Sequence, residues 1–485
     1  MRLPVSILAS ALALALLAVP AASARDAAPA TLPVPAHGVI GVQDAYFSPA
    51  FWVSRLQQPD QVLMDRAAIA SQNAELVRAD KSMHDLRALP ATLDRATVAG
   101  WIQELSERPE RERFDVDGKP VPAATLDALM ANLAIDAIPA SQAPRYGMVL
   151  ERAALRTFPT ALRVFSSAGD TDIDRFQESA LFPGTPVVIA HASADGEWLF
   201  VVSPRYAAWI AADAVAEGGR DAVFAHADKS PYRVVTGGKV ETVFTREQPQ
   251  LSELQLDMGV RVPLADVPLD ETVNGQHPYS SWIVELPLRG DDGRLAFAPA
   301  LLQKIADSQA DYLPLTRANL INQAFKFLGE RYGWGHSYTA RDCSGFVSEI
   351  YRSMGVQLPR NTSAQSVSPA FERVHFERGD SRDKRMAAVE ALDVGDLIYI
   401  PGHVMMYVGE IDGMPYVIHD TNGGSYLGAD GQLHSMHLNG VSLTPLLPLR
   451  FGKDRDYVDS ITNIVRVARH KGRSRISVSA CCACR

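Results

Sequence analysis

The stretch Arg341-Asp342-Cys343-Ser344-Gly345-Phe346 decides the fold of the C-terminal part of this chain, because it begins an amphipathic helix with a cysteine. Apolar residues then recur at helical spacing on the face of Cys343, namely Phe346, Val347, Ile350 and Met354. The free N–H groups and dipole of a helix start stabilise a thiolate, so we expect a lowered pKa for Cys343, opposed by the charge of Asp342. Cys343 is therefore a candidate nucleophile, with a small buried residue or half of a disulfide as the alternative.

Two histidines follow in a region whose apolar pattern predicts three successive strands, at residues 395–400, 403–409 and 416–420. A two-residue turn between the last two strands would place His403 and His419 on opposite faces of the sheet. We instead predict the three-residue loop Ile411-Asp412-Gly413, because such loops favour a left-handed glycine in third place.

With that loop, Met405 lies opposite His419, and His403 becomes a diagonal neighbour on the same face, about 7–8 Å away at the backbone. Asp420, the next residue along the strand, then points to the other face. A cysteine at a helix start and a histidine pair on a sheet supply a thiol, a general base and a group that orients the base. The sequence therefore predicts an activated nucleophile.

With these motifs, residues 311–451 resemble the NlpC/P60 family, the papain-like cysteine peptidases of bacterial cell-wall metabolism. The resemblance rests on ordered elements: Tyr332-Gly333-Trp334-Gly335, Asp342-Cys343-Ser344-Gly345-Phe346, Leu358-Pro359-Arg360, Gln365, Gly395-Asp396-Leu397, His403-Val404 and His419. It implies that Cys343 is the nucleophile, His403 the base and His419 the residue that orients the base. One departure is His336, where the family usually has a second glycine, and it bears on the shape of the groove rim.

The resemblance also implies substrate contacts. Asp342 and Ser344 would help to bind the free amine of an N-terminal L-alanine, and capping the helix is a second role for Asp342. Tyr332 would donate, together with the backbone N–H of Cys343, to the oxyanion that forms during acyl transfer. Trp334 would line the same groove. No metal ion or other cofactor is implied.

Three functions fit this reading. The usual activity of the family is hydrolysis of peptidoglycan stem peptides, in the wall or in muropeptides, at the amide between γ-D-glutamate and a diamino acid such as diaminopimelate. A Cys-His pair also suits an amidase or acyltransferase that acts on another amide or ester. The third function is a non-catalytic wall-binding protein, which the intact Cys343, His403 and His419 disfavour. A zinc site made of these three residues and His336 is a weaker variant.

Residues 1–24 read as a signal peptide, because Arg2 precedes an apolar run and the small-residue cleavage signature Ala22-Ser23-Ala24. The run is shorter than the ~20 residues that a membrane span needs, and no later stretch is apolar enough to span a bilayer. We therefore expect an exported protein, periplasmic or associated with the cell wall. The net charge of −9 argues against a nucleic-acid partner.

The 485-residue chain predicts a multidomain α+β protein. Residues near Asn73 and Asp85 resemble the helical N-terminal stabilising segment of multidomain NlpC/P60 enzymes, and the motifs around Trp198 and Trp209 resemble a bacterial SH3-type domain. Both tryptophans are expected in the barrel core, with ligand platforms as the alternative.

The predicted segments are a flexible leader (25–43), a helical N-terminal stabilising segment (44–138), two small SH3-like β-barrels (139–218 and 219–305), a papain-like α+β catalytic domain (306–455) and a disordered tail (456–485) with Cys481, Cys482 and Cys484.

Overall fold

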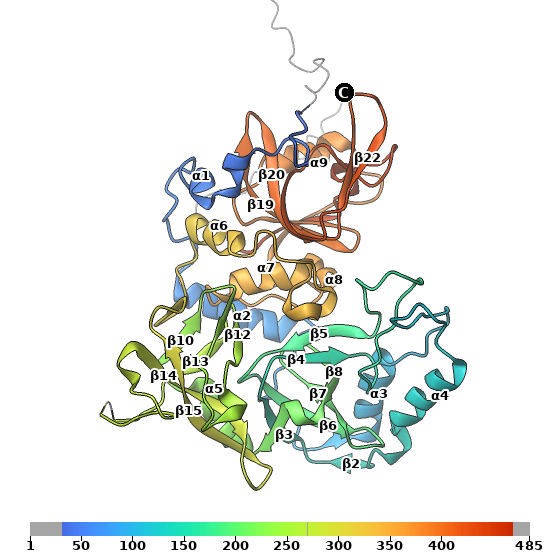
Figure 1. Cartoon of the computed structure of the whole chain (residues 1–485). Helices are drawn as coiled ribbons and strands as arrows, with labels where there is room; N and C mark the ends of the chain where they lie inside the picture. The colour runs from blue at the N-terminus through green and yellow to red at the C-terminus, as the bar shows by residue number, and fades with distance from the viewer. Residues whose placement is uncertain (1–31, 269, 469–485) are drawn as a thin grey trace, which may run out of the picture.

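The computed structural model describes residues 32–268 and 270–468. Figure 1 shows a C-terminal domain above two β-rich units that lie side by side, so the predicted multidomain α+β architecture is confirmed. The predicted signal peptide and the three C-terminal cysteines lie outside the described residues. Within the described part, no helix has the length and apolar character needed to cross a membrane.

The N-terminal helices are divided between the other units. The first two pack against the C-terminal domain, where Trp52 is 2% exposed and its ring centroid lies 5.4 Å from that of Tyr416. The next two cover the first β unit and share its apolar core. The predicted helical segment is therefore present, but its first two helices pack against the core of the C-terminal domain and its last two against the core of the first β unit. These helices are α1 (Pro49–Val53), α2 (Arg66–Ala79), α3 (Arg95–Leu105) and α4 (Ala123–Asn132).

The described end of the predicted flexible leader is ordered. Val42 is fully buried in the core of the C-terminal domain, and the Tyr416 hydroxyl donates a hydrogen bond of 2.6 Å to the carbonyl of Gly41. Ile40 is also buried against this domain. The leader prediction is wrong for residues 32–43, because burial of these apolar side chains outweighs the flexibility that the composition suggests.

The first β unit is a seven-stranded antiparallel sheet with the strand order β5-β4-β8-β7-β6-β3-β9. Trp209 is fully buried in its core and donates its indole N–H to Ser106 Oγ of the helical cover at 3.2 Å, and Trp198 packs against the same core. Both tryptophans are therefore packing residues. The strands are β3 (Arg145–Val149), β4 (Ala153–Arg156), β5 (Gln177–Leu181), β6 (Pro186–Ala192), β7 (Trp198–Val202), β8 (Ala207–Ala211) and β9 (Val215–Gly218), and β1 (Leu93–Asp94) pairs with β2 (Ser141–Gln142) outside this sheet.

The second β unit surrounds its own apolar core with three small sheets, β13-β10-β16, β11-β12 and β14-β15. Its description as a second SH3-like barrel stays a prediction. It comprises β10 (Tyr232–Val235), β11 (Lys239–Glu241), β12 (Gln255–Asp257), β13 (Arg261–Pro263), β14 (Ser281–Arg289), β15 (Leu295–Gln303) and β16 (Ser308–Gln309). The helix that precedes it, α5 (Arg220–Asp228), packs Phe224 into the core of the first β unit.

The C-terminal domain is built on a six-stranded antiparallel sheet with the order β17-β25-β18-β19-β20-β23, and α7 shares a core with one face of it. The three predicted strands correspond to β18, β19 and β20. The elements are α6 (Arg317–Phe325), α7 (Cys343–Arg352), α8 (Thr362–Val367), α9 (Arg382–Val389), β17 (Glu372–His375), β18 (Leu397–Ile400), β19 (His403–Ile411), β20 (Met414–Thr421), β23 (Gly440–Pro445) and β25 (Asn463–Arg466), with β21 (Gly424–Leu427), β22 (Leu433–Met436) and β24 (Leu449–Arg450) in a smaller sheet.

The predicted disordered tail contributes a strand to the middle of this sheet. β25 pairs with β17 on one side and with β18 on the other, and the flanking Ile461 is fully buried. The prediction for residues 456–485 is therefore wrong up to Ala468. The strand was not predicted because a segment of four residues without a flanking turn motif gives little sequence signal. Its strand conformation depends on pairing with β17 and β18, which are distant in the sequence.

We predict that truncation after Phe451 prevents folding, whereas removal of a disordered tail would have had no such effect. Loss of β25 would leave β17 without a partner and expose the edge of β18, so insoluble protein is expected. The matched control is truncation after Ala468, which should remain soluble and keep its circular dichroism spectrum. Soluble, folded protein from the Phe451 truncation would contradict the prediction.

Candidate active site

The predicted nucleophile lies at the first turn of α7. Asp342 is the N-cap, and one of its carboxylate oxygens accepts a hydrogen bond of 2.8 Å from the backbone N–H of Gly345. Cys343 is 5% exposed and has no hydrogen bond from its own N–H to another described residue. The helix start predicted from the apolar spacing is therefore confirmed, and its free N–H group is available to a ligand.

The hairpin that carries the histidines differs from the predicted one. The turn has two residues, Asp412 and Gly413, both with positive φ, and Ile411 pairs directly with Met414. The predicted three-residue loop is wrong. A β-bulge between Tyr407 and Gly409 then adds one residue to β19, and beyond it Met406 faces Ile418. The extra residue shifts the pairing by one position, so the β19 residues beyond the bulge face the other side of the sheet from the side that the turn alone would give them.

Because of this bulge, Met405 lies opposite His419, and the two histidines share a face as predicted. His403 Nε2 lies 2.7 Å from His419 Nδ1, and His419 Nε2 lies 3.0 Å from Thr444 Oγ1. If Nε2–H of each ring donates along this chain, Nδ1 of His403 is left unprotonated. In that direction of donation, the chain His403-His419-Thr444 holds a tautomer in which Nδ1 of His403 can accept a proton.

The residue after the base connects it to the nucleophile. A hydrogen bond from the backbone N–H of Val404 to the sulfur of Cys343 opposes the rise in the pKa of the thiol. Val404 also belongs to the same apolar core as Cys343, between α7 and the sheet. The structure thus brings Cys343, His403 and His419 into one site.

Burial controls the protonation of this site. It raises the pKa of Cys343 to about 12, with a further rise from the charge of Asp342, and it lowers the pKa of His403 to about 4. The expected lowering of the thiol pKa at the helix start is therefore wrong, because burial and Asp342 outweigh the helix dipole. At neutral pH the free site holds a neutral thiol and a neutral imidazole.

Asp420 occupies the opposite face of β20 from His419, as predicted from the alternation of a strand. It is fully buried, and neither of its carboxylate oxygens has a hydrogen bond to a described residue. Burial, with the charges of Asp342 and Glu330, raises its pKa well above the usual range. Burial therefore favours the protonated form of Asp420, and the residue lies outside the histidine chain.

Cys343 opens onto a cavity of about 500 Å³. The four predicted substrate-binding residues, Asp342, Ser344, Tyr332 and Trp334, all line it. Burial raises the pKa of Tyr332, so its hydroxyl keeps its proton and can donate. Sequence reasoning did not identify the part of the wall that the first β unit supplies, Gln177 and Glu178. The segment after α7, which includes Arg360 and Asn361, residues 399–402 and Thr462 also line the cavity.

Arg360 connects the cavity residues Asp342 and Ser344 to the first β unit. Its guanidinium donates 2.7 Å to Asp342, 2.8 Å to Ser344 Oγ and 2.6 Å to Ser179 Oγ of β5. Burial alone would raise the pKa of Asp342, but the charge and hydrogen bonds of Arg360 help to lower it to about 2. Asp342 is thus ionised and already engaged within the chain. The motif Leu358-Pro359-Arg360 marked this residue in the sequence, whereas nothing local marks Glu178.

His336 lies beneath the cavity and does not form its rim. The residue is buried, with Nδ1 at 3.0 Å from Arg360 Nη2 and Nε2 at 3.2 Å from Glu349 Oε1. Both ring nitrogens are therefore occupied away from His403 and His419. The structure does not assemble the alternative zinc site that needed His336 as a ligand.

Two family models match the sequence. A model described as SH3 domain (SH3b1 type) matches residues 163–211, and one described as NlpC/P60 family matches residues 329–445. The first match lies within the first β unit. The second contains all three residues of the site.

Individual curated relatives match part of the chain. A γ-D-glutamyl-L-lysine dipeptidyl-peptidase of Bacillus cereus is 34% identical over 109 residues, which are 21% of this chain and 29% of the relative. A probable endopeptidase p60 of Listeria welshimeri is 32% identical over 128 residues, 24% of this chain and 22% of the relative. The chain thus matches less than a third of the length of either curated relative.

One solved structure covers nearly the whole chain. An NlpC/P60 endopeptidase from Photobacterium damselae subsp. piscicida superposes with a TM-score of 0.70 over 91% of this chain and 99% of its own. The sequence identity is 16%, so this likeness concerns the fold. The arrangement of the N-terminal helices, the two β units and the C-terminal domain therefore recurs in another protein.

We predict that the orienting role belongs to His419 and not to Asp420. His419→Ala should reduce kcat for peptide hydrolysis by up to ~10⁴, because His403 would lose the partner that fixes its tautomer. His419→Asn and His419→Gln should cost less, since either amide can accept the hydrogen bond from His403. Asp420→Ala is the matched control on the same strand and should have a mild effect. A larger loss for Asp420→Ala than for His419→Ala would contradict the assignment.

The pH dependence of kcat/KM should reflect the buried base. His403 with a pKa of about 4 is neutral at pH 5, so kcat/KM should stay level from pH 7 to 5 and fall only near pH 4. Buried histidines with lowered pKa values bind protons more readily in the unfolded chain, so stability declines below about pH 6.5. Circular dichroism at each pH must therefore confirm that the protein is folded. An acid limb near pH 6.5 in folded protein would contradict the burial argument.

Proposed function

Since residues 329–445 belong to the NlpC/P60 family of cysteine peptidases, we propose that the protein hydrolyses peptidoglycan stem peptides at the amide between γ-D-glutamate and a diamino acid, through a cysteine acyl-enzyme. The proposal rests on the His403-His419-Thr444 chain, on the hydrogen bond from Val404, the residue after His403, to the sulfur of Cys343, and on the cavity of about 500 Å³ onto which Cys343 opens. The name of the Bacillus relative, a γ-D-glutamyl-L-lysine dipeptidyl-peptidase, supports the choice of bond.

The proposed reaction begins with both catalytic groups neutral. His403 Nδ1 accepts the proton of Cys343 as the thiolate attacks the carbonyl carbon, so charge separation accompanies attack. The backbone N–H of Cys343 and the hydroxyl of Tyr332 donate hydrogen bonds to the oxyanion. His403 then returns the proton to the leaving amine, and in the second half it activates the water that hydrolyses the thioester.

The chemistry of the cavity wall suits the N-terminal end of a stem peptide. Glu178 and Asp342 are the two acidic residues among the described residues that line the cavity, and both suit a free ammonium group. Thr157 and Tyr206 donate hydrogen bonds to Glu178, which fixes its carboxylate. Ser344 and Trp334 complete the proposed substrate contacts. Because the first β unit forms part of this wall, short muropeptides fit it better than long crosslinked strands.

The location proposed for this activity is outside the cytoplasm, in the periplasm or at the cell wall. The sequence pattern of residues 1–24 and the SH3-type match at residues 163–211 both support it. An amidase or acyltransferase that uses the same thiol would differ in the group that accepts the acyl chain, not in the site. Product analysis therefore separates the two activities.

We predict that the mature protein cleaves a defined stem peptide with a free N-terminal L-alanine into L-alanyl-γ-D-glutamate and a fragment that begins with the diamino acid, identified by mass spectrometry. A peptide with an acylated N-terminus should be cleaved more slowly, because it lacks the ammonium group. Cys343→Ala should abolish cleavage and keep the wild-type melting temperature, since the thiol is chemical and not structural. Hydrolysis by Cys343→Ala, or cleavage at a different bond, would overturn the proposal.

A further inference from the structure

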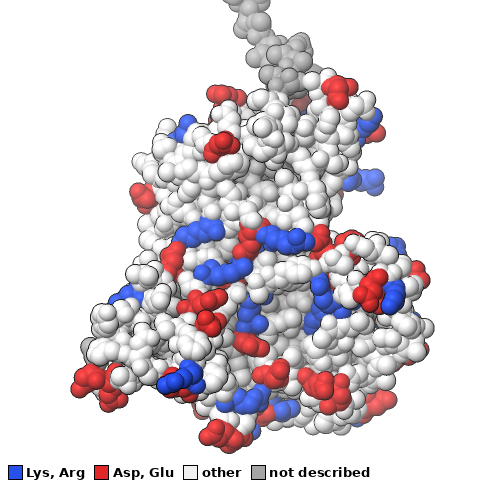
Figure 2. All heavy atoms as spheres, in the orientation of Figure 1, with Lys and Arg blue, Asp and Glu red and all other residues white. Residues whose placement is uncertain are grey.

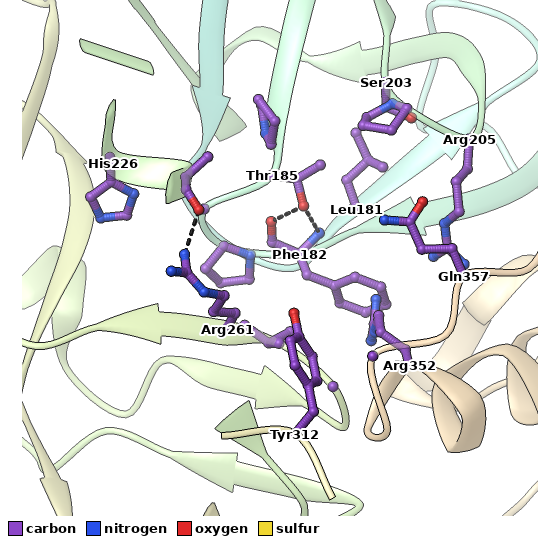
Figure 3. Close-up of a pocket in the computed structure, with 18 of the residues that line it drawn as sticks. Leu181, Phe182, Thr185, Ser203, Arg205, His226, Arg261, Tyr312, Arg352 and Gln357 are labelled. Carbon is purple, nitrogen blue, oxygen red and sulfur yellow. Dashed lines mark hydrogen bonds between the residues drawn. The ribbon is translucent and has the colours of Figure 1, made fainter. Parts of the chain in front are cut away.

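A second cavity, of about 270 Å³, lies where the two β units and the C-terminal domain meet. Figure 3 shows Arg205, Gln357 and Arg352 grouped on one side of this cavity, and Arg261 and His226 on the other. Arg205 follows β7 in the first β unit, Arg261 lies on β13 of the second, and Arg352 ends α7. The nucleophile's own helix therefore contributes to the wall of this second cavity.

The cavity is positively charged in an acidic protein. Three of its described lining residues are arginines and none is Asp or Glu, whereas the chain as a whole carries a net charge of −9. Figure 2 shows Lys and Arg side chains gathered at the waist, where the C-terminal domain meets the β units. A small positive hollow inside a negative molecule concentrates anions.

Internal partners account for only part of this charge. Arg352 donates to the carbonyl of Met258 and stacks 4.4 Å from the Phe182 ring centroid. Arg261 donates to carbonyls at the end of α5, and its guanidinium lies 3.9 Å from the centroid of the Tyr232 ring. Carbonyls and rings stabilise a guanidinium without cancelling its charge.

The carboxylate that forms an ion pair with Arg352 is shared with another arginine. Glu349 lies 3.9 Å from Arg352, but it is bound at 2.5 Å by Arg341. One carboxylate shared between two arginines leaves the positive charge of the cavity in excess.

Arg205 is the residue that points to a ligand. Its guanidinium has no hydrogen bond or ion pair with any described residue, although the side chain is half-buried. Burial and the charges of Arg352 and Arg360 lower its pKa, but it remains protonated at neutral pH. The hydroxyl of Tyr312 and the side-chain amide of Gln357, which also line the cavity, likewise have no hydrogen bond to a described residue. These three groups provide donors that a bound anion would satisfy.

We propose that this cavity binds a small, multiply charged oxyanion, a phosphate or polycarboxylate group, through Arg205 with support from Arg352 and Arg261. Planar guanidinium groups match the oxygens of both classes and form strong, charge-assisted hydrogen bonds with them. Because each arginine comes from a different unit of the fold, the bound anion would join the two β units to α7. Binding would therefore stabilise the arrangement of the domains.

The test is the melting temperature of the mature protein titrated with sodium phosphate or sodium citrate, against sodium chloride at equal ionic strength. A saturable rise is expected with phosphate, with citrate or with both, because a ligand that binds only the folded state stabilises it. The two arms identify the class of anion. Chloride should give no saturable rise. The measurement needs no substrate, so its outcome is independent of the proposed hydrolase activity.

Arg205→Gln should weaken the apparent affinity about tenfold or more, since a charge-assisted hydrogen bond is lost. Arg205 has no hydrogen bond or ion pair with a described residue, so this variant should fold. The matched control is Arg78→Gln, which removes an equal charge from an exposed pair with Glu75 on α2 and should bind like the wild type. General salting effects are not saturable and affect both variants equally. The absence of a saturable rise with either anion, or equal affinity in Arg205→Gln and the wild type, would overturn the proposal.

Discussion

The buried guanidinium of Arg341 is the interaction on which the arrangement of this protein depends. It is fully buried and contacts three carboxylates, at 2.9 Å from Asp257, 2.7 Å from Glu330 and 2.5 Å from Glu349. Asp257 belongs to the second β unit, whereas Glu349 lies on the nucleophile helix. A buried charge without partners is very unfavourable, and breaking such a group by removing one partner typically costs about 3–5 kcal/mol. The position of α7 is thus tied to that of the second β unit.

The same network extends from Arg341 to the nucleophile. Glu349 Oε1 lies 3.2 Å from His336 Nε2, and His336 Nδ1 lies 3.0 Å from Arg360 Nη2. Arg360 then donates a hydrogen bond of 2.7 Å to the carboxylate of Asp342, the N-cap of α7. Each step is a short contact between buried groups, which restricts the side chains to one geometry. Arg360 also reaches the first β unit through Ser179. The geometry around the thiol is therefore set by all three units, and this explains why residues far apart in sequence form one cavity.

The sequence was sufficient for the parts of the site that rest on local periodicity. The helix at Cys343 and the strands that carry His403 and His419 follow from apolar spacing over a few residues. The bulge near Val408 has no such signal, so the correct face for His419 was reached through a wrong loop. The pairing of Arg341 with Asp257, 84 positions away in the chain, could not be predicted from a single sequence, because it depends on how separate units dock. The central place of β25 was missed for the same reason.

Burial has opposite consequences for the stability and for the reactivity of this site. The packing that fixes α7 also removes water from Cys343 and raises its pKa to about 12, so the free thiol is a weak nucleophile. A neutral thiol resists oxidation and alkylation, which suits the location outside the reducing cytoplasm that we propose. In the proposed mechanism, reactivity then comes from a substrate that places its carbonyl against the N–H of Cys343 while His403 accepts the proton. In this arrangement the thiolate forms only when a peptide is present to receive it.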